Sequence, residues 1–364
     1  MPQSLTGAIS RRSLLAMMGA APAAAALSQV LPSSAFAAGG LNIYSWPDYF
    51  SNDDLAAYAA KSGVTPNIAT YNDNGALFAK LNGPAGAGFD IVIPSSGWIK
   101  LLADKNLLAE LDHSKIDFSA LDPALLNRDY DPGNIYSIPK DWGVLGVVYD
   151  PEAVGGEIKT WQDFFDAGAK PNVSGKVRLT KDAGETVGPA LWIAGKDWNK
   201  ATADDIRGTK DFLKGFAKHV KTVSGFDPAA LANGSIVLAQ ANQAAARGAI
   251  RQNPRLKWVV PGPHSEIWVD SYAIAAQAEN VDQAYDFLTF FLSPDIQVKE
   301  TQYLGYPHAI AGLQQKIAAD TPNADLIFGG PGVDFDSLTS FIVNPETIDV
   351  YQEVQNEVQA AAGA

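Results

Sequence analysis

The stretch YSIPKDWGVLGVVY, residues Tyr136–Tyr149, decides the fold that we expect for this chain. On both sides of it, short β-rich runs alternate with helical runs, and no low-complexity linker separates the two sides. Alternating strands and helices predict βαβ units and a largely parallel sheet. Without a linker, two lobes must be joined by strands that cross between them. We expect Tyr136–Tyr149 and a segment near Trp268–Ile274 to be those crossovers.

Crossover strands of this kind form a hinge, so the lobes can close around a ligand. Ligands of α/β sheets bind beyond the ends of the strands. The loops at Trp46, Ser95 and Asp182 each follow an expected strand, and we expect them to meet in the cleft between the lobes. The expected fold class is therefore α/β, with two lobes, crossover hinge strands and a ligand site in the cleft.

The expected elements follow from β-rich runs and from apolar residues at helical spacing. The expected strands lie at residues 41–46, 64–71, 89–93, 176–179, 235–240 and 257–260. The expected helices lie at a stretch beginning near residue 52 and at residues 74–81, 98–103, 186–193, 203–216, 281–292, 295–303, 309–319 and 345–361.

The first 37 residues predict an export signal of the twin-arginine type. Arg11 and Arg12 precede an alanine-rich apolar run that ends at Ala35-Phe36-Ala37, a small-x-small cleavage pattern. An ordinary N-terminal helix is the alternative. A membrane span is disfavoured, because proline and polar residues dilute a run that would need roughly 20 apolar residues. We expect a periplasmic protein and leave residues 1–37 out of the fold.

The remaining 327 of the 364 residues are more than one hydrophobic core usually serves, so we expect two lobes. We place the N-terminal lobe at residues 38–141 plus 270–313 and the C-terminal lobe at residues 142–269 plus 314–364. Removal of the signal takes away two arginines and no carboxylate, so the net charge of −13 becomes −15. An acidic surface favours cationic solutes and argues against nucleic acid as a partner. The chain has no cysteine, and its four histidines lack metal-ligand spacing, so we expect no metal site. We also expect no cofactor and a monomeric protein.

Three clusters supply the carboxylates and aromatic rings of a candidate site. They are Trp46-Pro47-Asp48-Tyr49, the pair Asp182 and Glu185, and the pair Trp268 and Asp270. Each alone has a structural explanation: a packed turn tryptophan, or an acidic cap at a helix N-terminus. Residues two apart on a strand point the same way, so Trp268 and Asp270 share a face. Together, the clusters suit an alkylammonium, because carboxylates accept its hydrogen bonds and rings pack on its stem and attract its charge.

The chain resembles the spermidine/putrescine-binding proteins of bacterial polyamine ABC importers over nearly all of the mature chain. The motifs that carry the resemblance are YSWPDYF at Tyr44–Phe50, FDIVIPSS at Phe89–Ser96, YSIPKDWGVLGVVYDP at Tyr136–Pro151, TKDAGE at Thr180–Glu185, IWVDSYAI at Ile267–Ile274, FLSPDIQ at Phe291–Gln297 and LGYP at Leu304–Pro307. The resemblance implies a periplasmic solute-binding protein fold, a small cationic amine as ligand and ABC permease subunits as partners. It also implies that the ligand-binding residues are Trp46, Asp48, Tyr49, Ser95, Asp182, Glu185, Trp268, Asp270 and Tyr306.

Three positions depart from the family pattern. A family tryptophan in the strand that matches residues 236–242 is replaced by Ala241, and a ring after the serine pair is lost at Gly97. Lys140 replaces a neutral residue beside the first crossover. A lost ring would open volume, and a gained cation could bind a carboxylate.

Three functions compete on these residues. The first is a receptor for a cationic amine such as a polyamine. The second is the same receptor for a zwitterionic amino-acid or opine-like compound, bound partly by Lys140 or Arg247. The third is an exported hydrolase in which two of the site carboxylates act as acid and base. We expect no enzyme, because no nucleophile–base pair, metal set or phosphate-binding glycine loop is found.

Overall fold

The structure is a computed structural model that describes residues 40–83, 86, 88–317, 321–331 and 333–363. The predicted signal at residues 1–37 lies outside the described residues. No helix in the described ranges has the length and apolarity needed to cross a membrane.

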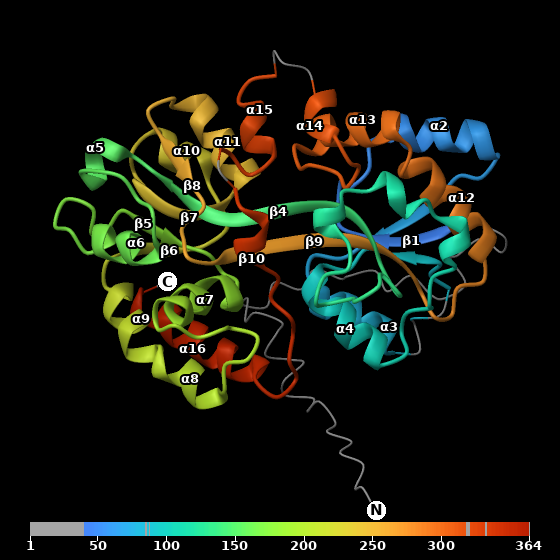
Figure 1. Ribbon diagram of the computed structural model, residues 1–364. Helices are drawn as coiled ribbons and strands as arrows, with labels where there is room; N and C mark the ends of the chain where they lie inside the picture. The colour runs from blue at the N-terminus through green and yellow to red at the C-terminus, as the bar shows by residue number, and fades with distance from the viewer. Residues whose placement is uncertain (1–39, 84–85, 87, 318–320, 332, 364) are drawn as a thin grey trace, which may run out of the picture.

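One mixed sheet runs through the whole molecule (Figure 1). Its strands are β1 (Asn42–Ser45), β2 (Asn67–Thr70), β3 (Ile91–Val92), β4 (Ile138–Tyr149), β5 (Val177–Leu179), β6 (Val220–Val223), β7 (Leu238–Asn242), β8 (Lys257–Val259), β9 (Ser265–Ile274) and β10 (Leu338–Thr339). The order along the sheet is β2-β1-β3-β9-β4-β7-β5-β6, with β8 on β4 and β10 on β9.

The predicted crossovers are confirmed as the long strands β4 and β9, which pair antiparallel in the middle of the sheet. Among the described strands, every antiparallel pair contains β4 or β9, whereas β1 pairs β2 and β3 in parallel, and β5 pairs β6 and β7 in parallel. The prediction of a largely parallel sheet therefore holds within each half and is wrong at the crossing strands. Antiparallel pairing arises there because the chain passes between the halves in opposite directions on β4 and β9.

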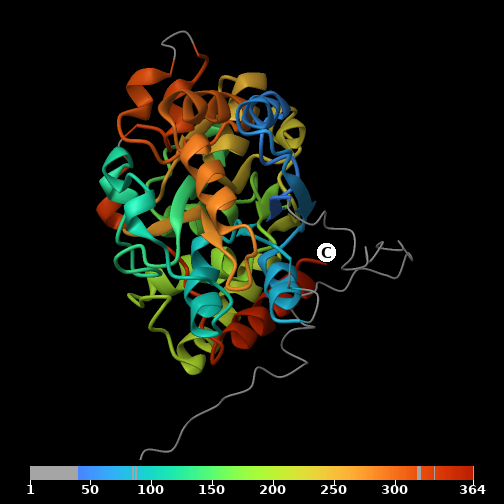
Figure 2. The same ribbon diagram turned by 90° about the vertical axis from the view of Figure 1, so that its right-hand side faces the viewer.

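Helices cover both faces of the sheet (Figure 1). The α-helices are α2 (Asn52–Ser62), α3 (Asn74–Leu81), α4 (Ser96–Asp104), α5 (Pro151–Val154), α6 (Trp161–Gly168), α7 (Ala183–Ile193), α8 (Ala203–Gly208), α9 (Lys210–Ala217), α10 (Pro228–Ala232), α11 (Gln243–Gln252), α12 (Val281–Phe291), α13 (Pro294–Leu304), α14 (Leu313–Lys316), α15 (Ala324–Ile327) and α16 (Ile348–Ala361). Short 3₁₀ helices lie at His113–Lys115, Phe118–Ala120, Pro123–Leu125 and Phe335–Ser337. Although α2 and α12 are far apart in sequence, they pack together on the same half (Figure 2).

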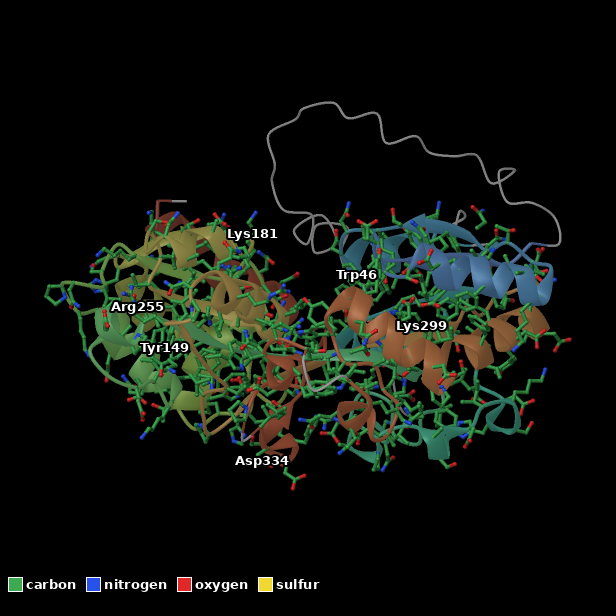
Figure 3. The ribbon with its side chains drawn as sticks, turned by 90° about the horizontal axis from the view of Figure 1, so that it is seen from above. Trp46, Tyr149, Lys181, Arg255, Lys299 and Asp334 are labelled. Atoms are coloured by element: carbon green, nitrogen blue, oxygen red, sulfur yellow. The ribbon has the colours of Figure 1, made fainter. Side chains whose placement is uncertain are left out.

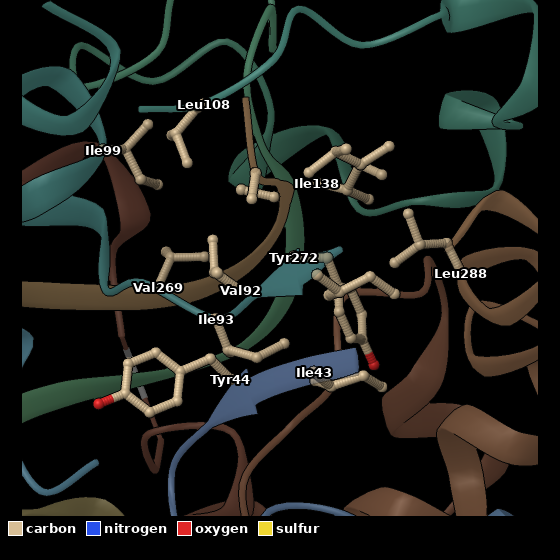
Figure 4. Close-up of a cluster of buried hydrophobic side chains, with 14 of the residues drawn as sticks. Ile43, Tyr44, Val92, Ile93, Ile99, Leu108, Ile138, Val269, Tyr272 and Leu288 are labelled. Carbon is tan, nitrogen blue, oxygen red and sulfur yellow. The ribbon is translucent and has the colours of Figure 1, made fainter. Parts of the chain in front are cut away.

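The two halves of the sheet have separate hydrophobic cores. One core surrounds β1 and β3, and its buried side chains include Ile43, Val92 and Leu288 (Figure 4). The other surrounds β5 and β6 and packs against α16. The crossing strand β4 serves both, because Val144 belongs to the first core and its neighbour Leu145 to the second.

Some predicted elements differ from the observed ones. The helix expected at residues 203–216 is two helices, α8 and α9, that meet at Thr209, whose hydroxyl donates to the Ile206 carbonyl. Such side-chain bonds compete with the helix ladder. The strand expected at residues 235–240 lies at Leu238–Asn242, and the helix expected at residues 309–319 is helical in its described part only at Leu313–Lys316.

Candidate ligand-binding site

The floor of the candidate site is built by the pairing of β4 and β9. Asp141 lies opposite Asp270, and Gly143 lies opposite Trp268. Strand alternation places Glu266, Trp268 and Asp270 on one face of β9, and we call these three residues the β9 row. A Cβ atom at position 143 would collide with the Trp268 indole, so glycine is needed there for the ring to lie across β4.

One hydroxyl links the two aspartates at the first end of this floor. Tyr49 Oη lies 2.6 Å from Asp141 Oδ1 and 2.5 Å from Asp270 Oδ2. A single phenol proton can be donated to only one carboxylate, so the second contact needs a proton on a carboxyl group. Burial, followed by the charge of Asp141, raises the pKa of Asp270 to about 7, in agreement with that need. Asp270 is 6% exposed, and its Oδ1 makes no direct hydrogen bond with a described residue, while the nearby Ser95 side chain opposes the rise of the Asp270 pKa.

The positively charged side chain of Lys140 lies beside Asp141 and Tyr49. Its side chain is fully buried, and its Nζ lies 2.7 Å from Asp141 Oδ2 and 3.9 Å from the centre of the Tyr49 ring. His308 lies 3.5 Å from Lys140 Nζ, and burial together with that cation lowers the pKa of His308 well below its usual value. Lys140 pairs with Asp141 and not with Asp270, so it does not satisfy Oδ1 of Asp270.

Asp141 and Asp270 form one anionic group, and carboxylates at the N-terminus of α7 form a second. Asp182 caps the helix, and its Oδ1 accepts a hydrogen bond from the Glu185 backbone NH at 3.0 Å. Burial, followed by the charge of Asp182, raises the pKa of Glu185 to about 7, while Arg178 opposes that shift. Glu266 of the β9 row faces the same helix end. Burial and the charges of Glu185 and Asp182 raise its pKa well above the ordinary value, although part of the Glu266 side chain remains exposed.

Tyr306 lies between the two anionic groups. Its ring meets the Trp268 ring edge-on, with 5.0 Å between the centroids. Burial, Asp141 and Asp270 raise the pKa of its phenol, and a hydrogen bond with Asn242 opposes the shift. The predicted residues Tyr49, Asp182, Glu185, Trp268, Asp270 and Tyr306 are thus brought together from both halves of the molecule.

Two further predicted residues border this group. The Ser95 backbone bridges to Asp270, and the Ser95 side chain accepts a hydrogen bond from Asn74 at 3.0 Å. Trp46 packs on Tyr71 with 4.7 Å between the ring centroids, and its indole NH is buried without a hydrogen-bond partner in the described ranges. Figure 3 shows Trp46 on the side of its half that faces the other half, and labels Lys181 on that other half.

Asp48 is not brought to the group. It is exposed, adopts a left-handed backbone with φ of 55°, and makes no hydrogen bond or ion pair with a described residue. Aspartate tolerates this turn conformation, which accounts for its presence after Pro47.

The structure shows what surrounds the three residues that depart from the family pattern. Ala241 pairs with Gly146, so it faces away from the β9 row, whereas its neighbour Asn242 faces the row and contacts Tyr306. A Cβ atom at Gly97 would collide with the Phe341 carbonyl oxygen, so backbone and not open volume lies there. Neither position enlarges the site, and Lys140 is directed to Asp141 and not to a ligand carboxylate.

Glu266 was missed by the sequence analysis. Strand alternation could have indicated it, because Glu266 lies two residues before Trp268 and Asp270 lies two residues after it. In the described part of the chain, no cluster of three or more histidine or carboxylate side chains is arranged to hold a metal ion.

Comparison with known proteins identifies the family. A family model described as bacterial extracellular solute-binding protein matches residues 55–326. The chain is 30% identical over 297 residues to spermidine/putrescine-binding periplasmic protein 1 of Haemophilus influenzae, covering 78% of this chain and 81% of that protein. It is 28% identical over 291 residues to the spermidine/putrescine-binding periplasmic protein of Escherichia coli K12, covering 79% and 82%.

A solved structure agrees with the sequence relatives. The spermidine/putrescine ABC transporter substrate-binding protein PotD of Streptococcus pneumoniae superposes with a TM-score of 0.77 at 26% identity, covering 89% of this chain and 99% of that one. The expectation of a binding protein, rather than an enzyme, is confirmed by these matches. On the residues matched and the share of the chain covered, this protein belongs to the bacterial extracellular solute-binding protein family.

Proposed function

We propose that this protein is the periplasmic receptor of an ABC importer and that it binds a polyamine, such as putrescine or spermidine, between its two lobes. The observation that carries the proposal is the Oδ1 atom of Asp270, which is buried and has no partner among the described residues. A buried carboxylate oxygen is costly without a hydrogen-bond donor. An alkylammonium supplies both the donor and the opposite charge.

The surroundings of Asp270 fit the rest of such a ligand. The rings of Trp268 and Tyr306 lie beside it, where they can pack on methylene groups and attract a cation. Carboxylates follow on the far side of Trp268, at Glu185 and Glu266. The sequence relatives named for spermidine and putrescine support the same ligand class.

A zwitterionic ligand is less well served. It needs a free cation for its carboxylate, and Lys140 and Arg247 were the candidates. The Lys140 ammonium is paired with Asp141, and the Arg247 guanidinium donates to the Pro322 carbonyl through both Nε and Nη2. Both candidates are therefore already engaged within the protein.

The receptor is a two-lobed periplasmic protein that closes on its ligand. We propose residues 38–141 plus 270–313 as one lobe and residues 142–269 plus 314–364 as the other. The separate cores support two lobes, while Ile267, Val269 and Leu338 of the second set pack in the first core. The lobes close about β4 and β9 when the ligand binds. A twin-arginine signal at residues 1–37 exports the protein, which delivers its ligand as a monomer to ABC permease subunits.

A thermal-shift screen tests the ligand class. At 100 times Kd, a ligand of the folded state adds about 2.7 kcal/mol of stability. At roughly 2–4 °C per kcal/mol, the resulting rise in Tm is easily measured. Putrescine and spermidine should produce this rise, and γ-aminobutyrate and glutamate should not. A rise with a zwitterion and none with either polyamine would replace the proposed ligand class.

A further inference from the structure

We propose that Glu266 binds a second ammonium group of the ligand, on the opposite side of Trp268 from Asp270, and so makes the receptor prefer polyamines to monoamines. This inference rests on the proposed function and extends it to a residue that the family pattern did not provide. It assigns the two ends of the β9 row to two charges of one ligand.

The β9 row gives the spacing of the two ends. Glu266 and Asp270 are four residues apart on a strand that rises about 3.3 Å per residue, so their Cα atoms lie about 13 Å apart. Trp268 stands between them, with its ring across Gly143 and against Tyr306. A methylene chain that crosses this ring would present its two ammonium groups to opposite ends of the row.

Packing places Glu266 near the N-terminus of α7. Thr339 of β10 lies opposite Glu266, and two residues later Phe341 packs so closely on Gly184 that an added Cβ atom would lie 3.2 Å from its ring. Gly184 is the second residue of α7, between Asp182 and Glu185. The charges of Glu185 and Asp182 also act on the Glu266 carboxyl group and raise its pKa, so carboxylates from two elements face one another and the helix N-terminus alone is not the site.

The charges of this group are not balanced within the protein. The Glu266 side chain makes no hydrogen bond or ion pair with a described residue, and the Thr339 hydroxyl opposite it is buried without a hydrogen-bond partner in the same ranges. The nearby guanidinium of Arg178 is held by the carbonyl groups of Ser224 and Gln240. Asp270 provides the independent sign of a cation, because it is nine-tenths buried on the same face of the same strand with an unpartnered oxygen.

Calorimetric titration of the mature protein with butylamine, putrescine and spermidine at pH 8 tests the assignment. We expect Glu266→Gln to weaken putrescine and spermidine binding about 5- to 30-fold, between the effects of exposed and buried charge pairs. Butylamine binding should change by less than about threefold, because a monoamine needs only the Asp270 end. Glu266→Asp, which keeps the charge, should restore most of the affinity for both polyamines.

The matched control is Glu110→Gln, which removes the same charge from an exposed residue that makes no hydrogen bond or ion pair with a described residue. It should leave all three titrations unchanged. Equal losses for butylamine and putrescine in Glu266→Gln would mean a merely structural role, and unchanged polyamine binding would mean no contact; either result overturns the inference while the proposed function stands. Failure of the wild-type protein to bind any amine would overturn both.

Discussion

We expect Asp270 and Glu185 to make ligand binding depend on pH. Burial raises the pKa of each carboxyl group to about 7, with added repulsion from Asp141 and Asp182, respectively. Below pH 7 these groups hold protons that an ammonium ligand must displace. We therefore expect amine affinity to fall from pH 8 to pH 5.5 by about 30-fold for each group that must ionise. Calorimetric titration across this range checks it, and a flat profile would contradict these shifts.

The same groups affect the stability of the ligand-free protein in the opposite direction. An acid whose pKa is raised on folding contributes stability that is complete below its unfolded value near 4 and is lost as the pH rises through about 7. Ligand-free protein loses this contribution at pH 8, whereas bound ammonium compensates the charges. The rise in Tm with putrescine should therefore be larger at pH 8 than at pH 5.5, as melting curves at both values will show.

Gly143 is the residue on which the position of the Trp268 ring depends. Gly143→Ala puts a methyl group into the space of the indole, so the ring must move. Such overpacking typically costs about 1–3 kcal/mol of stability. We expect a lower Tm and weaker putrescine binding. The control is Gly208→Ala, where an added Cβ atom meets nothing within 4 Å; it should keep full affinity.

Within α7, substitutions of the N-cap residue Asp182 distinguish the effect of its charge on binding from the effect of its helix cap on stability. Asn is as good an N-cap as Asp, whereas Ala at this position typically costs about 1 kcal/mol. Asp182→Asn should therefore melt near the wild type, and Asp182→Ala should melt lower. Both should weaken putrescine binding, because both remove a carboxylate that faces Glu185 and Glu266. Wild-type affinity in Asp182→Asn would make Asp182 a cap only.

Elements with strong local signals could be predicted from the sequence. The helix at Asn74–Leu81 was predicted with the observed bounds, and the crossing strands were found because no linker separates the lobes. The antiparallel pairing of β4 with β9 could not be predicted, since it depends on contacts between residues over 100 positions apart. Lys140 was interpreted as a cation for a ligand carboxylate, although in the fold it is buried and pairs with its neighbour Asp141.

The candidate site was predictable where one strand or one loop carried it. Trp268 and Asp270 share a face by strand alternation alone. Gly97 and Ala241 were interpreted as positions where an aromatic ring of the family is lost. The sequence does not show that the Phe341 backbone covers Gly97 or that Ala241 faces away from the site. Distant packing decided both positions.

At the scale of the whole molecule, the two cores joined by β4 and β9 predict a hinged motion. Putrescine at saturation should reduce the radius of gyration measured by small-angle X-ray scattering, because the lobes close on a bound ligand. Asp270→Asn at the same putrescine concentration should scatter like the ligand-free protein. An unchanged radius for saturated wild-type protein would contradict closure about these strands.

We propose that Asp270 holds an ammonium group of the ligand in the space between the two halves. Asp270→Asn keeps the shape of the side chain and removes its charge, and loss of one member of a buried charge pair typically costs about 2–5 kcal/mol. Calorimetric titration with putrescine should therefore show affinity reduced by roughly 30-fold to several thousand-fold, with the fold retained. Full affinity together with a lower Tm would mean that Asp270 only stabilises the fold, and would contradict its role in holding the ammonium group.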